Sequence, residues 1–479
     1  RKLLPTNNIK FDDNISLDYK TSYGGFKNNG KEYVVLNKNT LTPWSNVISN
    51  ESFGTIVTNN GCGYTFFENS LEFKITSWTN EMVINDKSEG IKINGLSFDV
   101  ERCTHGFGYS ILESEQEDLK TSITEFVAKD DPVKIYLVSI KNKESVSKNI
   151  ELAYYINPVL GNFEEKTGRH ILSEMNKEKN YMHLRNVYNI AYSDVSVFLS
   201  SSCSIENSIT DRILVKEIST SISIDPNEEK SIVFMLGCSR NVNNIDSIIK
   251  KYNTVPLCRK ALSDVKDNWD KKLSTIQIKT NDKSFDYMIN GWYLYQTISS
   301  RIFARAGFYQ VSGAYGYRDQ LQDAMNICMV CEDYTKKQIL INASHQFRQG
   351  DVLHWWHEKT KFGLRSRYKD DYLFLVYAVL RYIECTDDYK ILDEQVPFIE
   401  GEELTKYEAD RGITFRYSSD KESLYSHIIL ALSYSMNQLG SHGLPLMGGG
   451  DWNDGMNRVG IKGKGESVWL GFFLYMLID

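Results

Sequence analysis

The feature that most constrains this chain is a change of pattern near Asn244. Before it, short β-branched and aromatic runs such as Val133–Val138 and Ser231–Leu236 are separated by turn clusters such as Asn28-Asn29-Gly30. After it, apolar residues recur at helical spacing, with charged residues on the opposite face. Many short strands with turns between them are typical of an antiparallel sandwich. We therefore predict a β + α multidomain chain in which the strands come first and the helices follow.

The same change of pattern predicts three segments. We expect an N-terminal antiparallel β-sandwich over residues 1–240, a helical linker over residues 241–283 and a helical domain over residues 284–479. Helices that pair and return, with elaborate loops at one end, indicate an α/α toroid or barrel, and the lack of a fixed-period repeat argues against a solenoid. The predicted helices are Phe285–Arg305, Gln320–Cys331, Lys336–Gln349, Tyr372–Cys385, Ser423–Leu439 and Val468–Ile478.

Composition excludes several classes of protein. The chain has 479 residues, of which 41% are hydrophobic, so it can bury large cores. Its net charge of -7 argues against a protein that binds nucleic acid through phosphate contacts. The longest apolar stretches are too short to span a bilayer, the N-terminus lacks a signal-peptide core, and the cysteines have no disulfide-framework spacing. We predict a reduced, cytoplasmic protein with no nucleic-acid partner and no membrane contact from this segment.

The most unusual stretch runs from Gly443 to Gly460. Its three consecutive glycines, Gly448–Gly450, exclude a regular helix or a strong strand. Two carboxylates, Asp451 and Asp454, follow them and flank Trp452 and Asn453. A surface turn is one interpretation, but it does not explain the tryptophan, and a Ca²⁺ loop fits poorly because Asp454 comes one place early. A ligand site on a loop is the favoured interpretation.

A second polar cluster lies where a glycine-rich turn, Ser312–Gly316, meets a predicted helix. Arg318 and Asp319 stand at this junction. Asp319 would serve there either as a helix cap, because exposed N–H groups attract a carboxylate, or as a ligand-binding residue. The residues alone leave both interpretations open.

A third cluster is the aromatic stretch Gln349–His357. It contains Trp355 and Trp356 between two histidines, and Arg365 and Asp370 follow it. Two histidines three residues apart are a weak metal signal, and no third ligand has an obvious spacing, so we predict no metal site. The tryptophan pair suits a carbohydrate platform or a core pair, although adjacent residues point in different directions.

The chemistry of the glycine-rich stretch suggests glycosyl transfer. Burial against the indole of Trp452 would raise the pKa of a neighbouring carboxyl, which is how lysozyme keeps its general acid protonated. An inverting hydrolase needs a second carboxylate to activate water, whereas a phosphorylase needs a cationic pocket for phosphate. The chain has no Ser nucleophile elbow, Walker loop or dinucleotide fingerprint.

At these three clusters the sequence resembles the inverting β-glycan phosphorylases of glycoside hydrolase family ninety-four. It is most similar to the branch of 1,2-β-oligoglucan phosphorylases and of the C-terminal region of cyclic β-1,2-glucan synthases. Gly313 stands where disaccharide-specific members carry an Arg, which favours this branch. The stretches that carry the resemblance are Gly24–Phe26, Thr42–Trp44, Gly63–Ser70, His105–Tyr109, Asp130–Lys134, Gly313–Asp323, Gly350–His357 and Gly448–Gly460.

The resemblance implies a carbohydrate-binding-like sandwich, a helical linker and an (α/α)6 catalytic barrel. Residues 284–479 would form the N-terminal half of that barrel, so we expect an incomplete enzyme that is inactive alone and leaves helix faces exposed. The resemblance further implies a general acid at Asp454 and a phosphate ligand at Arg301. The substrate-binding residues that it implies are Trp452, Asp319, Arg318, Asp451, Trp355, Trp356, Arg365 and Asp370.

The predicted activity is inverting phosphorolysis of a β-linked glucan to α-glucose 1-phosphate, with a β-1,2 linkage as the first guess. The expected partners are a β-glucan oligosaccharide and inorganic phosphate, which is a co-substrate, and we predict no cofactor. Family members are often homodimers. Two alternatives remain: a chain-length-trimming region of a cyclic glucan synthase, and an inactive carbohydrate-binding remnant.

Overall fold

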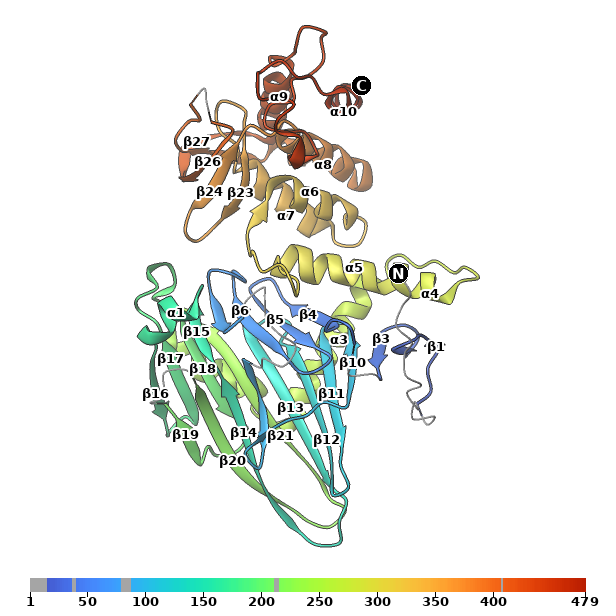
Figure 1. The fold of residues 1–479 in the computed structure, drawn as a ribbon, viewed down its shortest axis with the longest axis vertical. Helices are drawn as coiled ribbons and strands as arrows, with labels where there is room; N and C mark the ends of the chain where they lie inside the picture. The colour runs from blue at the N-terminus through green and yellow to red at the C-terminus, as the bar shows by residue number, and fades with distance from the viewer. Residues whose placement is uncertain (1–14, 37–39, 79–87, 211–214, 406–407) are drawn as a thin grey trace. The chain divides into compact units, whose positions relative to one another are not determined.

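A computed structural model of the chain describes residues 15–36, 40–78, 88–210, 215–405 and 408–479 (Figure 1). The chain divides into two compact units, Arg1–Gly313 and Ala314–Asp479. Unit 1 holds the β-sandwich and a group of helices, and unit 2 is mainly helical with two small sheets.

The larger sheet of unit 1 has eleven strands, and every strand pair in it is antiparallel. Its order is β1-β2-β3-β10-β11-β12-β13-β21-β18-β17-β16. The strands are β1 (Tyr19–Lys20), β2 (Gly24–Lys27), β3 (Glu32–Val35), β10 (Arg102–Gly106), β11 (Tyr109–Glu115), β12 (Leu119–Val127), β13 (Val133–Asn142), β16 (Leu172–Asn176), β17 (Tyr181–Arg185), β18 (Ser196–Ser201) and β21 (Glu229–Ser239).

Two five-stranded sheets complete the sandwich, in the orders β19-β20-β14-β8-β9 and β15-β7-β6-β5-β4. The strands of the first are β8 (Glu89–Ile93), β9 (Leu96–Ser97), β14 (Lys148–Ile156), β19 (Asn207–Ile209) and β20 (Lys216–Ile224), and those of the second are β4 (Ser45–Ser49), β5 (Phe53–Thr58), β6 (Gly63–Phe67), β7 (Lys74–Thr76) and β15 (Pro158–Gly161). The short helices α1 (Glu164–Thr167), η1 (Gly168–His170) and η2 (Ile190–Tyr192) lie in its connections.

The core of the sandwich lies between the sheets. Strand β13 is typical, because its first half is buried on both faces and pairs with β12 and β21, for example Val138 with Ile123 and Ile232. These side chains join one buried cluster with residues of the two smaller sheets, such as Ile75 and Leu152. The prediction of an N-terminal antiparallel sandwich followed by a helical region is confirmed.

Helices follow the last strand of unit 1. They are η3 (Val242–Asn244), α2 (Ile245–Tyr252), α3 (Val255–Leu273) and one long helix made of α4 (Lys283–Tyr287), η4 (Met288–Trp292), α5 (Tyr293–Gln296) and η5 (Thr297–Ala304), in which η4 and η5 are π-helical. The long helix is held on the sandwich by hydrogen bonds. The Tyr295 hydroxyl donates to Asn46 at 2.8 Å, and Ser49 donates to the Ser299 carbonyl at 2.7 Å.

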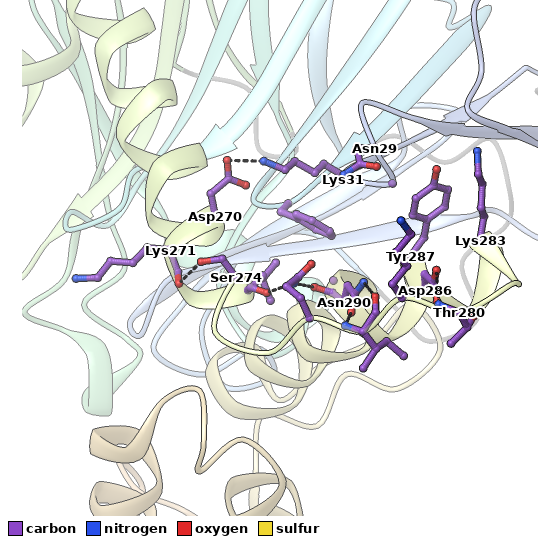
Figure 2. Close-up of a pocket in the computed structure, with 17 residues that line it drawn as sticks. Asn29, Lys31, Asp270, Lys271, Ser274, Thr280, Lys283, Asp286, Tyr287 and Asn290 are labelled. Carbon is purple, nitrogen blue, oxygen red and sulfur yellow. Dashed lines mark hydrogen bonds and ion pairs between the residues drawn. The ribbon is translucent and has the colours of Figure 1, made fainter.

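A cavity of about 740 Å³ opens where the helices of unit 1 meet the β2–β3 turn (Figure 2). An ion pair between Lys31 and Asp270 lies at one side of it. The segment between α3 and α4 forms its wall, since Asn290 bonds both backbone groups of Ile278 and Asp286 accepts hydrogen bonds from Thr280. The polar groups of this wall therefore satisfy one another.

The helices of unit 2 occur close to where the sequence predicts them. Helix α6 begins and ends earlier than its predicted span, and α7 is likewise shifted towards the N-terminus. Within the described ranges, no helix is both long and apolar enough to cross a membrane. The helices are α6 (Tyr317–Asn326), α7 (Glu332–Ala343), α8 (Asp371–Thr386), η6 (Tyr389–Asp393), α9 (Leu424–Met436), η7 (Asp454–Met456) and α10 (Val468–Ile478).

Two small sheets interrupt these helices, and one of them corrects the sequence analysis. The second half of the aromatic stretch Gln349–His357 is a strand, in which Trp356 pairs with Gly363. Leu353, Trp356 and His357 of this strand are buried, whereas His354 and Trp355 are half-buried. The strands are β22 (Tyr315–Gly316), β23 (Leu353–His357), β24 (Phe362–Ser366) and β26 (Asp410–Thr414) in one sheet, and β25 (Gln395–Glu400) and β27 (Arg416–Ser423) in the other.

Candidate active site

Three consecutive glycines, Gly448–Gly450, place a loop of unit 2 against the backbone that precedes α8. Gly449 N–H donates to the Arg367 carbonyl at 2.9 Å, and Lys369 N–H donates to the Gly450 carbonyl at 3.0 Å. Gly448 has a φ of 60°, and a Cβ there would lie 2.6 Å from the Arg367 carbonyl oxygen. Only glycine fits such a close approach without strain. The glycines therefore fix the position of the residues that follow, Asp451–Asp454, which we call the acid loop.

Asp451 anchors the acid loop. Its side chain is buried and accepts hydrogen bonds from the Ser467 hydroxyl at 2.7 Å and from Asn453 N–H at 3.0 Å. Ser467 in turn caps α10 by accepting from Leu470 N–H. Both carboxylate oxygens are thus engaged inside the unit, and the predicted role of Asp451 in substrate binding stays a prediction.

Arg318 joins the acid loop to the start of α6. Its guanidinium donates to both carboxylate oxygens of Asp454 at 3.2 Å and to the Trp452 carbonyl at 3.1 Å. The same group also donates to Asp370 at 3.1 Å. Burial alone would lower the pKa of Arg318, but the two carboxylates hold it raised. We call Asp370, Arg318 and Asp454 the arginine triad.

Asp370 lies at the buried end of the triad. It stands directly before α8, its side chain is fully buried, and its Oδ1 has no hydrogen-bond partner among the described residues. Burial, together with the negative charge of Asp371, raises the pKa of Asp370 to about 7 even though Arg318 opposes the shift. No part of the carboxyl reaches the surface, and the predicted role of Asp370 in substrate binding stays a prediction.

Asp371 contacts a second basic side chain, His354. Its Oδ2 lies 2.8 Å from His354 Nδ1, and its Oδ1 is buried without a partner in the described part of the chain. Burial lowers the pKa of His354, but the carboxylates of Asp371 and Asp454 outweigh it and leave that pKa raised. The adjacent carboxyls Asp370 and Asp371 therefore contact one basic side chain each, Arg318 and His354.

His354 was not among the predicted site residues, and its placement depends on an irregularity in the β23–β24 pairing. The pairing of β23 with β24 shifts between Leu353 and Trp355, so His354 lies at a β-bulge. Bulges redirect side chains and are common beside active sites. The His354 ring packs on Tyr368, at 4.5 Å between ring centroids. Tyr368 in turn forms an isolated β-bridge with Gly450, which precedes the acid loop.

The acid loop exposes the residues that were predicted to act on a ligand. The Trp452 residue is 55% exposed, and the Asp454 side chain is 42% exposed. The indole therefore does not bury the carboxyl, contrary to the expectation from the lysozyme arrangement. Asp319, in the first turn of α6, has a side chain that is 51% exposed and lies 3.5 Å from Arg318. These exposed groups are available to a ligand.

The predicted tryptophan platform does not form. Trp356 is fully buried in the core of unit 2, where it stacks on His345 at 3.9 Å and on Tyr315 at 5.4 Å between ring centroids. Trp355 points to the opposite face of β23 and is half-buried. Neighbouring residues of a strand face opposite sides, so the two indoles do not form one surface. The substrate-binding roles of Trp355 and Trp356 stay predictions.

Arg365 is also a buried structural residue. It pairs with Asp351 through two hydrogen bonds of 2.7 and 2.8 Å, and its guanidinium lies 3.7 Å from the centroid of the Phe347 ring. The predicted role of Arg365 in substrate binding stays a prediction. Arg301 lies in η5 of unit 1 and is exposed, so its role as a phosphate ligand stays a prediction. Among the described residues, no three His, Cys, Asp or Glu side chains are grouped to hold a metal ion.

Comparison with protein families gives this arrangement a context. Residues 268–479 match the catalytic domain of the glycosyl hydrolase 94 superfamily, and residues 31–95 and 97–214 match the supersandwich domain of the same family. The chain belongs to glycoside hydrolase family 94. The predicted resemblance is therefore confirmed, and the two matched domains correspond to the sandwich-then-helix order of the structure.

Individual relatives include synthases and phosphorylases. The chain is 32% identical to the cyclic β-(1,2)-glucan synthase NdvB of Rhizobium meliloti (strain 1021), over 96% of this chain and 18% of the synthase. It is 22% identical to the N,N'-diacetylchitobiose phosphorylase of Vibrio proteolyticus, over 95% of this chain and 64% of the phosphorylase. It is 24% identical to the solabiose phosphorylase of Paenibacillus borealis, over 95% of this chain and 62% of that enzyme. The chain thus spans less than two thirds of the length of each.

A solved structure supports the fold. A protein of the human microbiome, described as a candidate kojibiose phosphorylase, aligns with a TM-score of 0.50 at 12% identity, over 76% of this chain and 57% of that protein. At this identity the likeness concerns the fold alone.

Proposed function

We propose that this family 94 chain takes part in the inverting phosphorolysis of a β-linked glucan. The observation that carries the proposal is the position of Arg318, which links Asp454 and Trp452 to the start of α6 beside Asp319. Arg318 thus contacts two exposed carboxylates, Asp454 and Asp319, and the backbone of the exposed Trp452. Named phosphorylases and a glucan synthase among the relatives favour a glycan substrate.

In the proposed reaction Asp454 is the general acid. Its proton passes to the glycosidic oxygen as the bond from that oxygen to the anomeric carbon breaks. A phosphate oxygen forms the new bond to the anomeric carbon from the opposite face, which inverts it and gives α-glucose 1-phosphate. Trp452 would line the site for the cleaved sugar, and Asp319 would accept hydrogen bonds from its hydroxyls.

Arg318 and His354 are the basic side chains near Asp454. Arg318 contacts Asp454 directly, and the carboxylates of Asp371 and Asp454 raise the pKa of His354. We keep Arg301 as a phosphate-binding candidate. Phosphate is a co-substrate in this scheme, and we propose no cofactor and a cytoplasmic reaction.

We further propose that the helices of unit 2 belong to an (α/α)6 barrel. Support comes from α10, which exposes a large apolar face, since Phe472 and Tyr475 are 74% and 69% exposed. A continuous apolar helix face of this kind is normally covered by another element. Further barrel helices are the covering that the family membership favours.

A second candidate function is supported by one observation, the 32% identity to a cyclic β-(1,2)-glucan synthase over nearly the whole chain. In that case the chain would trim glucans within a larger synthase. This role predicts that long β-1,2-glucans are shortened by phosphate in preference to disaccharides.

A phosphate-dependence assay tests the proposal. The full-length protein that contains this chain is incubated with β-1,2-, β-1,3- and β-1,4-oligoglucans, with and without phosphate, and glucose 1-phosphate and free reducing sugar are measured separately. We expect α-glucose 1-phosphate from one linkage only when phosphate is present. Reducing sugar formed without phosphate would instead identify a hydrolase, and glucan binding without any product would favour the binding remnant.

A further inference from the structure

Helix capping does not explain the burial of the Asp370 carboxyl. It occupies the position before α8, but its side chain makes no capping hydrogen bond to that helix. Its carboxyl is fully buried and directs Oδ2 to Arg318 at 3.1 Å, while Oδ1 has no partner among the described residues. Burying a carboxylate is unfavourable unless the charge serves a nearby cation.

The cation paired with Asp370 is Arg318, which also contacts the acid loop. A single guanidinium nitrogen of Arg318 donates to Asp370, to Asp454 and to the Trp452 carbonyl, at 3.1, 3.2 and 3.1 Å. The second terminal nitrogen completes the contact with Asp454 at 3.2 Å. A guanidinium is planar and rigid, so its orientation is set by the acceptors on both sides. A displacement of Asp370 would therefore turn Arg318 and move Asp454.

We propose that Asp370 is a positioning residue that acts through Arg318 to set both the place and the charge balance of Asp454, and this inference rests on the proposed function. Asp370 itself does not touch substrate. Its negative charge balances Arg318, so that the positive charge acting on the exposed Asp454 is reduced.

The charged groups around Asp370 define when this balance operates. Arg318 faces it from α6, Asp454 lies beyond Arg318, and Asp371 adjoins it on α8 and carries His354 from β23. Since the pKa of Asp370 is raised to about 7 by burial and by Asp371, its negative charge is fully present only above neutral pH. The effect of removing it should therefore be largest on the alkaline side of the pH profile.

The test is the pH profile of kcat for phosphorolysis by the full-length protein and its Asp370→Asn variant. Asparagine keeps the size and one acceptor oxygen but removes the charge. The uncompensated Arg318 then favours the ionised form of Asp454, so we expect the alkaline limb to move to lower pH by about one unit. Misplacement of the acid should lower kcat at the optimum roughly tenfold, while KM for the glucan changes less than about twofold.

The matched control is Asp351→Asn. Asp351 forms another buried pair with an arginine of unit 2, Arg365, at 2.7 Å, and Arg365 makes no recorded contact with the acid loop in the described part of the unit. The same substitution there should lower stability and leave the pH limb in place. If Asp370→Asn behaves like this control, with a stability loss and an unmoved limb, the inference is overturned.

A double-variant cycle tests whether Asp370 acts on Asp454 through Arg318. It also keeps the inference testable if Asp370→Asn alone folds poorly. The variant Asp370→Asn/Arg318→Gln lacks both charges and so leaves no unpaired buried ion. We expect its pH limb to coincide with that of Arg318→Gln, and a further shift would contradict action through Arg318. Crystal structures of the parent and Asp370→Asn proteins give a readout without activity, in which the Arg318 guanidinium should have turned and Asp454 should have moved with it while the two side chains stay in contact. An inactive parent would refute the proposed function, whereas an active parent with unchanged Arg318–Asp454 geometry in the variant would refute only this inference.

Discussion

Unit 1 and unit 2 each contain a largely buried cation between two carboxylates, and these two clusters differ in their exposure to solvent. In unit 1, Lys134 bonds to Glu89 at 2.7 Å, to Glu125 at 2.9 Å and to the Thr55 hydroxyl at 3.0 Å. Its side chain is 1% exposed, and the carboxylates are 2% and 7% exposed. Burial would lower the pKa of Lys134, but the two carboxylates hold it raised. We call these residues the lysine triad.

The arginine triad has the same charges but is open at one end. Asp370 is sealed, Arg318 is nearly so, and Asp454 is 42% exposed. All three donors of the lysine triad have acceptors, whereas the arginine triad leaves a buried carboxylate oxygen without a partner among the described residues. The difference teaches that ion chemistry alone does not identify a site. A fully buried triad whose donors all have acceptors suits a structural role. A triad with one exposed carboxylate, and with one buried carboxylate oxygen that lacks a partner among the described residues, suits a role in catalysis.

The largest expected effect comes from the exposed end of the arginine triad. Asp454→Asn removes the only proton that the proposed mechanism transfers, so phosphorolysis should fall by about a thousandfold or more. Stability should change little because the side chain is half exposed, and glucan binding should survive. The measurements are initial rates of glucose 1-phosphate formation, glucan titration by calorimetry and the melting temperature. Full activity would remove Asp454 from the role of general acid.

The reciprocal change in the lysine triad should act on stability. Glu89→Gln leaves Lys134 buried with one charged partner, which should cost about 3–5 kcal/mol in the free energy of unfolding. Denaturation in urea, followed by circular dichroism of the strands, measures this loss. The rate of phosphorolysis per folded molecule should stay within about twofold of the parent. A loss of activity at unchanged stability would break the distinction between the two triads.

The fold was largely predictable from the sequence because it rests on periodic patterns. Strands such as β13 and β21 are short β-branched runs, and helices such as α8 and α10 show long apolar spans, so both kinds of element appear in single windows of sequence. The glycines at 448–450 likewise signalled an irregular backbone. The β23–β24 hairpin was missed because Leu-His-Trp-Trp-His does not alternate between apolar and polar residues.

The site was predictable as a set of residue types and not as a set of contacts. Arg318 and Asp454 are 136 positions apart, and their pairing depends on how α6 and the acid loop pack. The burial of Trp356 depends on stacking against His345, and the pairing of Arg365 with Asp351 spans a hairpin. A β-bulge at His354 has no reliable sequence signal. From the sequence alone, the side chains of Trp356, Arg365 and Asp454 suit a ligand site equally well. The structure distinguishes them by burial, because only Asp454 of the three is exposed.

A smaller effect concerns the pH dependence of stability at the sealed end of the arginine triad. The pKa of Asp370 is raised by burial and by Asp371 to about 7, whereas an Asp in the unfolded chain titrates near about 3.9. The folded protein therefore binds this proton more tightly, and its stability falls as the pH rises from about 4 towards 7. Asparagine does not titrate. The melting temperature of Asp370→Asn relative to the parent should thus rise between pH 5 and pH 8, by about 5 °C.

The control for that measurement is Asp454→Asn, which should show no such trend relative to the parent. A constant difference between Asp370→Asn and the parent across this pH range would mean that Asp370 stays ionised in the folded protein. The buried end of the arginine triad would then resemble the satisfied lysine triad more closely than its unpartnered oxygen indicates.

The smallest expected effect on catalysis is at Trp452 of the acid loop, and Trp356 of β23 provides the comparison. Trp452→Ala removes an aromatic face that is 55% exposed, so KM for the glucan should rise about five- to tenfold with little change in melting temperature. Trp356→Ala should do the reverse, because it leaves a cavity beneath His345 and costs about 3–5 kcal/mol of stability. Steady-state kinetics and thermal melts of both variants make the comparison. An unchanged KM in Trp452→Ala would mean that the open surface beside Asp454 does not hold the sugar, and the search for the sugar site would move to the exposed Asp319 at the start of α6.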